Sequence, residues 1–198
     1  MLTLAWGLFL LVLLAGAGAV LAALLDCDAA LLPLPLLSAA ALVLNPFGML
    51  GNLRIGAAAA VLLLGAAVVV GVVRLRPAGV GTAVKTALTR PGFALFLGGA
   101  AFIWCLFALH RPMFTQWDEF TAWGLAPKMV VERAAFYVAD PVNLKASFTY
   151  PATSLVTFLF QPFGTWAEWA CLAPLDTLAL ACVAAASTMP RPQWPGGI

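Results

Sequence analysis

Residues 2–25 read LTLAWGLFLLVLLAGAGAVLAALL and contain no charged side chain over 24 positions. A helix of about 20 consecutive apolar residues spans the hydrocarbon core of a bilayer, so this segment is long enough to cross a membrane with some tilt. No Lys or Arg precedes it, and its apolar run is longer than that of a secretory signal peptide. We therefore expect residues 2–25 to form a retained first transmembrane helix.

The whole chain shares this apolar character. Of its 198 residues, 64% are hydrophobic and only 9% are charged, and the mean hydropathy is +1.02. A soluble domain carries about 25% charged residues, so the charge content excludes a globular protein with a water-facing surface. The high hydrophobicity also excludes disorder for most of the length. Ten basic and eight acidic residues give a net charge of +2, which is too weak and too dispersed for a nucleic-acid-binding surface.

Further apolar segments predict an all-α, polytopic membrane bundle of about five or six membrane segments. After residues 2–25 these are residues 29–50, 55–73, 93–110, 151–163 and 165–187. Segment 151–163 is too short to span, so we expect it to be short or re-entrant. Segment 29–50 contains three prolines and is either a short crossing helix or a re-entrant one. Residues 1–187 then form one transmembrane domain, and residues 188–198, rich in Pro and Gly, form a flexible tail.

Basic residues indicate which side of the membrane faces the cytoplasm. The loop 74–92 has four basic residues and no acidic one: Arg74, Arg76, Lys85 and Arg90. Because cytoplasmic loops carry an excess of Lys and Arg, we expect this loop in the cytoplasm and the loop 111–150, one helix later, on the outer face. Four full crossings before that outer loop put the amino terminus outside, whereas a re-entrant segment 29–50 puts it inside.

The expected outer loop, residues 111–150, holds eight of the eighteen charged residues. Its aromatic residues are mixed with the charges, as is typical of a segment that lies in the membrane–water interface. Within it, Asp118 and Glu119 follow an apolar helix in the string FTQWDEF. A carboxylate can act as a general base when its surroundings raise its pKa, and an acidic pair can hold a divalent cation. The two residues are therefore the candidate catalytic residues, and Asp118 is also a candidate metal ligand.

These charged residues also have structural interpretations. Thr115 and Asp118 fit a helix capping box, and an acid in the first turn suits the helix dipole. Lys128 and Glu132 are one helical turn apart, which favours a surface pair, although a lysine at headgroup level can also contact a phosphate. Asp176 lies in an otherwise apolar segment, where an ionisable residue is a functional candidate and is equally suited to a polar contact with a partner helix.

The order of these motifs resembles that of polytopic GT-C glycosyltransferases, which are similar to one another chiefly in an acidic motif of an early extracytoplasmic loop. The matching features are, in order, an apolar helix, Trp117-Asp118-Glu119, Trp123, Lys128 and Tyr150-Pro151 at the start of another apolar helix. The resemblance covers residues 95–187, about half of the chain. Members of this family usually have more helices, so the resemblance implies either a truncated or split member or an inactive relative.

The resemblance implies the transfer of a sugar from a polyprenyl-phosphate carrier at the outer face of the cell (inner or plasma) membrane. By that implication Asp118 is a general base or metal contact with Glu119 in support, and Lys128, Trp123 and Tyr150 bind substrate. A divalent cation is the one cofactor that this interpretation includes. The implied partners are the bilayer, the lipid-linked sugar and further membrane helices of a partner chain, with no nucleic acid.

Two interpretations from other classes stay open. A membrane assembly or scaffold protein would use its Gly- and Ala-rich helices to pack against a partner. A transporter subunit would have broken helices in corresponding halves, whereas this sequence contains no paired repeat. Replacing the loop carboxylates by amides separates the classes, because the change lowers transfer by an enzyme about 100-fold or more and leaves a scaffold functional.

Overall fold

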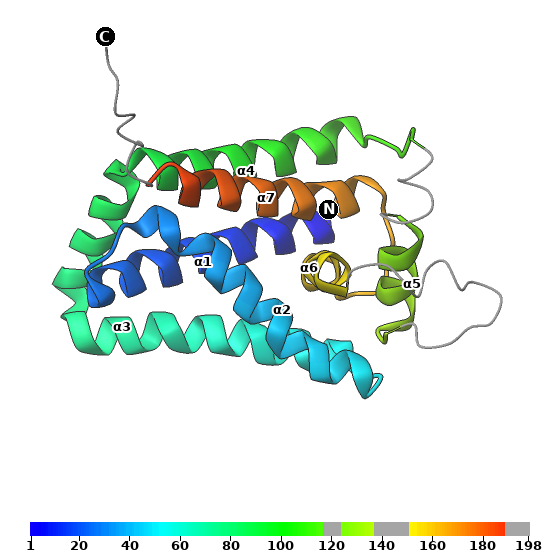
Figure 1. Ribbon diagram of the computed structural model, residues 1–198, viewed down its shortest axis with the longest axis horizontal. Coiled ribbons are helices and arrows are strands. Elements are labelled where there is room, and N and C mark those ends of the chain that lie inside the picture. The colour runs from blue at the N-terminus through cyan, green and yellow to red at the C-terminus, as the bar shows by residue number, and fades with distance from the viewer. Residues whose placement is uncertain (117–123, 137–150, 189–198) are drawn as a thin grey trace, which may run out of the picture.

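The computed structural model describes residues 1–116, 124–136 and 151–188. Within these ranges every regular element is a helix and none is a strand. In chain order the elements are α1 (Leu2–Leu25), the 3-10 helix η1 (Ala29–Leu31), α2 (Pro33–Met49), α3 (Leu53–Thr89), α4 (Pro91–His110), α5 (Leu125–Arg133), α6 (Pro151–Phe160) and α7 (Trp169–Ala186) (Figure 1). The all-α helical bundle predicted from the sequence is confirmed.

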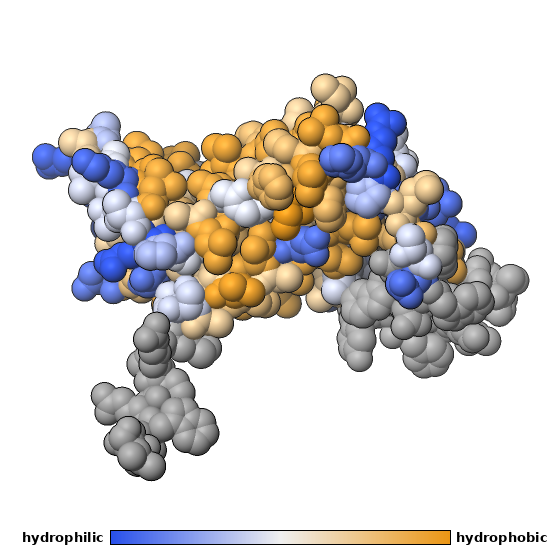
Figure 2. All heavy atoms as spheres, turned by 90° about the horizontal axis from the view of Figure 1, so that it is seen from above, coloured by the Kyte–Doolittle hydropathy of each residue, from blue (hydrophilic) through white to orange (hydrophobic). Residues whose placement is uncertain are grey.

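Five segments of the described chain are long and apolar enough to cross a membrane: α1, Ala29–Met49, α3, α4 and α7. Large apolar side chains on these helices face outward, and Leu62, Val73 and Phe102 are 72%, 72% and 65% exposed. Figure 2 shows the result on one face, a hydrophobic band across the middle with most hydrophilic residues toward the two ends. Such a surface is unfavourable in water and suits lipid. The protein is therefore a multi-pass membrane protein.

The spans run back and forth between two ends of the bundle (Figure 1). We call one end the loop end: it holds the amino terminus, the α2–α3 turn, α5 and the start of α7. The other, the basic end, holds the α1–η1 link, the last part of α3 and the end of α7. Pro33 is tolerated at the start of α2 because a first-turn residue needs no N–H donor, and α2 continues to the loop end. The amino terminus and α5 therefore lie at the same end of the bundle (Figure 1), and the side of the membrane that this end faces stays a prediction.

The basic segment differs from its prediction. The sequence predicts a loop over residues 74–92, but α3 continues to Thr89 with a break at Arg76, where φ is 60° and ψ is 161°. Pro77 lacks an N–H donor and restricts the residue before it, so the first helical stretch stops there. Proline is also favoured in a first helical turn, and residues 77–89 therefore form a short second helix that crosses the basic end (Figure 1). We call it the 77–89 helix.

Small residues bring the helices close around one large side chain. Trp104 on α4 is fully buried, and a Cβ added to Gly7 of α1 would lie 2.5 Å from its Cζ3 atom. The Trp104 indole donates to the hydroxyl of Thr177 on α7 at 3.0 Å, and that hydroxyl donates to the carbonyl of Ala173 at 2.8 Å. Glycine permits such close approach between membrane helices, so α1, α4 and α7 meet at this point.

Candidate functional site

The predicted site belongs to the segment that joins α4 to α7 at the loop end. Four of its five residues lie outside the described residues: Asp118, Glu119, Trp123 and Tyr150. Their roles, the cation at Asp118 and the capping box with Thr115 stay predictions. Lys128 lies within the described residues.

Lys128 is on α5, which begins at Leu125 and has Pro127 in its first turn, where proline is favoured. The face of α5 with Met129, Val130 and Val131 is buried, whereas Lys128 is exposed. Glu132 is exposed one turn later, and no ion pair joins the two residues within the part of the chain that the structure describes. The Lys128 ammonium is thus directed to solvent at the loop end.

Two backbone hydrogen bonds dock α5 against the turn between α2 and α3. The N–H of Leu53 donates to the carbonyl of Ala134 at 2.9 Å, and the N–H of Phe136 donates to the carbonyl of Gly48 at 3.0 Å. A Cβ on Gly48 would lie 2.7 Å from the Phe136 ring, so the absence of a side chain there allows the ring to pack. The position of Lys128 is thereby fixed relative to two membrane spans.

α6 lies across the direction of the spans and is seen almost along its axis in Figure 1. One of its contacts with the bundle is a hydrogen bond: the indole N–H of Trp6 on α1 donates to the carbonyl of Leu159 at 2.9 Å. Ser154 and Thr157 on α6, and Gln161 just after it, are at most 3% exposed. This short helix therefore brings buried polar groups to the loop end beside α5.

Gln161 has one buried group whose hydrogen-bonding capacity is unused. Its Oε1 accepts from the N–H of Ala167 at 3.2 Å, but its Nε2 has no hydrogen-bond partner among the described residues. Leaving a buried donor without an acceptor costs about 1–3 kcal/mol. Such groups in native structures call for an explanation, and an acceptor oxygen of an ordered water or a bound molecule would satisfy this one.

Two charged residues outside the predicted site also lie at the loop end. The Glu168 carboxylate accepts from the backbone N–H of Phe114 at 2.8 Å, which ties the segment after α4 to the start of α7. Arg54 at the start of α3 is exposed, and a Cβ on Gly164 would lie 3.2 Å from its Nη2. Arg54 and Lys128 therefore supply two cations from separate elements.

The sequence held a signal for only some of these residues. Gln161 is a polar residue between the apolar run SLVTFLF and a proline. A glutamine at the end of such an apolar run can be recognised in the sequence as an exception. Arg54 is a lone cation next to an apolar span and has no such local signal. Its part in the loop end depends on α3 starting beside the α6–α7 link, which is a tertiary contact.

Asp176 does not lie with the polar and charged residues gathered at the loop end. It is partly exposed on α7, seven residues after Trp169, which corresponds to about 10 Å along the helix. It has no hydrogen-bond or ion-pair partner in the described ranges. Its predicted contact with a partner helix stays a prediction.

No metal-binding cluster of three or more His, Cys, Asp or Glu side chains occurs among the residues that the structure describes. No protein-family model matches the chain, and no curated protein or solved structure shows significant similarity to it. The fold and the site define a multi-pass membrane protein with polar and cationic groups gathered at the loop end of the bundle.

Proposed function

We propose that the chain is a GT-C-type membrane glycosyltransferase, or a truncated or split part of one, which uses a polyprenyl-phosphate sugar at the outer face of the cell membrane. The observation that carries the proposal is the buried, unpartnered Nε2 of Gln161, which directly follows α6 at the loop end. The described residues around this end also include Gln116, after α4, and Gly124, the N-cap of α5. These two residues flank the segment that contains Asp118 and Glu119. A sugar hydroxyl or a phosphate oxygen supplies the acceptor that Gln161 lacks.

In the proposed reaction a hydroxyl oxygen of the acceptor attacks the anomeric carbon of the sugar. The bond between that carbon and the carrier phosphate breaks, and the phosphate leaves with the bonding electrons. Asp118 takes the hydroxyl proton as general base, with Glu119 in support. Lys128 and Arg54 stabilise the charge of the leaving phosphate. In the alternative role, Asp118 would hold a divalent cation, which would supply the same charge stabilisation.

A cavity between α2 and α6 supports access for the carrier from the bilayer. It has a volume of about 400 Å³ and is lined on α2 by Ser38, Ala41, Leu42 and Asn45, and on α6 by Ala152 and Leu155. Ser38, Leu42 and Asn45 are exposed on the outside of the bundle. An apolar chain can therefore lie against α2 and α6 while its phosphate reaches the loop end.

The test is release of free polyprenyl phosphate from a panel of polyprenyl-phosphate sugars by the chain in proteoliposomes, measured in the presence of a panel of acceptor alcohols. We expect Asp118→Asn to reduce the rate about 100-fold or more, as loss of a positioned base does, and to leave membrane insertion unchanged. Glu132→Gln is the matched control, because it removes an exposed carboxylate from α5. Equal rates for the wild type and Asp118→Asn would remove Asp118 from the mechanism.

Assembly with a partner membrane protein is the second candidate function, and Asp176 is the observation that favours it. A carboxylate near the centre of a membrane helix costs about 2.5–3.5 kcal/mol, and a polar residue of a partner helix would offset that cost. In this case Asp176→Leu abolishes co-purification with the partner, while Asp118→Asn leaves the partner bound.

A further inference from the structure

A second cavity opens at the basic end, far from the candidate site. Its volume is about 350 Å³, which falls within the range of about 300–1,000 Å³ found for small-molecule sites. It lies between the end of α1 and the 77–89 helix, and its walls are small residues of both, including Ala19, Ala22 and Ala83. The packing of these two helices thus leaves a space of ligand size where the bundle meets the headgroup region.

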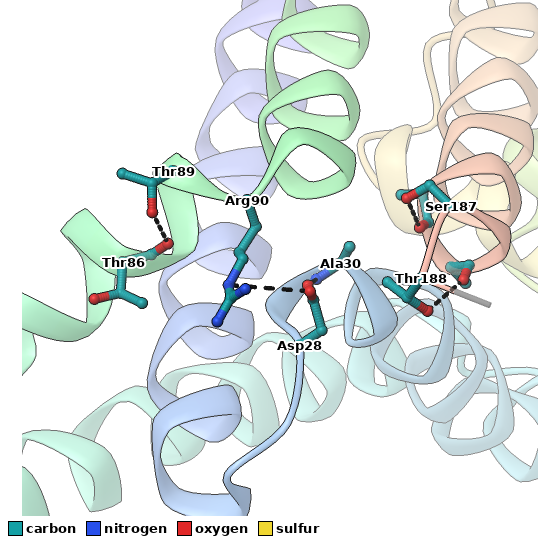
Figure 3. A network of polar contacts seen from close by, with 9 residues as sticks. Asp28, Ala30, Thr86, Thr89, Arg90, Ser187 and Thr188 are labelled. Atoms are coloured by element: carbon teal, nitrogen blue, oxygen red, sulfur yellow. Dashed lines mark hydrogen bonds and ion pairs between the residues drawn. The ribbon is translucent and has the colours of Figure 1, made fainter. Parts of the chain in front are cut away.

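The cavity carries a cation and an anion. Arg90 lines it, and its Nε lies 4.0 Å from the Asp28 carboxylate, which also accepts from the N–H of Ala30 at 2.9 Å (Figure 3). Asp28 is therefore within ion-pair distance of Arg90. Asp26 lines the same cavity, is exposed, and has no ion-pair partner within the described residues.

The surroundings favour a lipid as occupant. Leu25 of α1 and Leu88 of the 77–89 helix are 65% and 46% exposed, so apolar surface continues from these two helices to the bilayer. Arg74 and Lys85 add positive charge at the same end, and basic residues at a membrane surface attract lipid phosphates. The charged groups of the cavity therefore lie at the depth in the membrane where phospholipid headgroups lie.

We propose that this cavity binds the headgroup of a phosphatidylethanolamine. The lipid phosphate pairs with Arg90, and its primary ammonium donates hydrogen bonds to the carboxylate of Asp26. The small-residue walls accommodate the part of the lipid between the phosphate and the acyl chains. A phosphatidylglycerol headgroup has no cation for Asp26, and a phosphocholine headgroup has no N–H donor. The proposal does not depend on the proposed transferase function.

The test uses the full chain in nanodiscs that contain equal amounts of phosphatidylethanolamine, phosphatidylcholine and phosphatidylglycerol. Native mass spectrometry then measures which lipids stay bound after gentle release. A charge-assisted hydrogen bond corresponds to a preference of about tenfold or more, so we expect phosphatidylethanolamine to exceed each of the other two by that factor. Asp26→Asn should remove the preference over phosphatidylcholine, and Arg90→Gln should reduce retention of every phospholipid.

Two further variants make the result specific. Arg74→Gln removes a basic residue of the same end that does not line the cavity, and it should leave the preference for phosphatidylethanolamine over phosphatidylcholine unchanged. Ala23→Phe fills the cavity while keeping both charges, and it should displace the lipid even if Arg90→Gln disturbs the basic end through Asp28. Three results would each overturn the proposal. They are equal retention of the three lipids by the wild type, preferential retention of phosphatidylglycerol, and an unchanged preference for phosphatidylethanolamine in Asp26→Asn.

Discussion

The indole N–H of Trp104 donates to the hydroxyl of Thr177 in full burial, and this bond joins α4 to α7 across 73 residues of sequence. The same indole stacks on Phe160 with a centroid distance of 5.1 Å and meets Trp169 edge-on at 6.0 Å. Phe160 ends α6 and Trp169 begins α7. One side chain therefore links the membrane spans to the short helix of the loop end.

We expect this hydrogen bond to contribute modestly to stability, because a membrane-embedded side chain finds alternative partners when unfolded. Double-mutant cycles in membrane helices average about 0.6 kcal/mol, with a maximum near 1.7. Trp104→Phe and Thr177→Val, alone and together, should give a coupling energy in that range when unfolding is measured in detergent. A coupling energy of zero would show that ring packing alone holds α4 against α7.

The close approach of α1 to Trp104 predicts a size limit at Gly7. A Cβ there would meet the buried indole at 2.5 Å, and overpacking of a core costs about 1–3 kcal/mol. Gly7→Ala should therefore destabilise the protein by that amount. Gly65→Ala is the matched control, since no atom of the described residues lies within 4 Å of its added Cβ. Equal unfolding midpoints for the two variants would contradict the packing.

The five spans were predictable from the sequence because each is a run of apolar residues with the length that a bilayer requires. The continuation of α3 to Thr89 was not, since Pro77 both ends one helical stretch and starts the next. Gln161 and Arg54 illustrate a further limit. Their places depend on α6 lying across the bundle, and no local pattern encodes that arrangement.

Cys27 at the basic end should react slowly with alkylating reagents. Partial burial raises the pKa of its thiol, and the neighbouring carboxylates of Asp28 and Asp26 raise the pKa further. Because the thiolate is the reactive form, alkylation at neutral pH should be slower than for a free thiol and should accelerate as the pH rises. Asp28→Asn lowers the pKa and should speed the reaction. Alkylation followed by mass spectrometry checks this, and an unchanged rate in Asp28→Asn would exclude the carboxylate effect.

The orientation of the bundle in the membrane can be measured by labelling at the positions of two exposed lysines. Lys128 lies on α5 at the loop end, and Lys85 lies on the 77–89 helix at the basic end. In a background without native cysteines, we expect a membrane-impermeant maleimide to label Lys128→Cys in intact cells and to label Lys85→Cys only after lysis. The reverse pattern would put the loop end in the cytoplasm, and the proposed use of carrier-linked sugars at the outer face would then be wrong.

The docking of α5 against the α2–α3 turn predicts a local effect of Gly48→Ala. The added Cβ would meet the Phe136 ring at 2.7 Å, so the ring must move and the hydrogen bond from Phe136 to the Gly48 carbonyl weakens. A local destabilisation of 1.4 kcal/mol, within the usual range for overpacking, raises the open population about tenfold. Limited trypsin digestion should therefore cleave after Lys128 about tenfold faster, while the membrane spans stay folded.

A second substitution separates this steric effect from a general loss of stability. Phe136→Leu shortens the side chain that Gly48→Ala displaces, so the double variant should recover most of the slow cleavage at Lys128. Fragment masses identify the cleavage site, and circular dichroism checks the helix content of each variant. If Gly48→Ala left the cleavage rate unchanged, α5 would not be held by this turn, and Lys128 would lose its fixed position relative to α2 and α3.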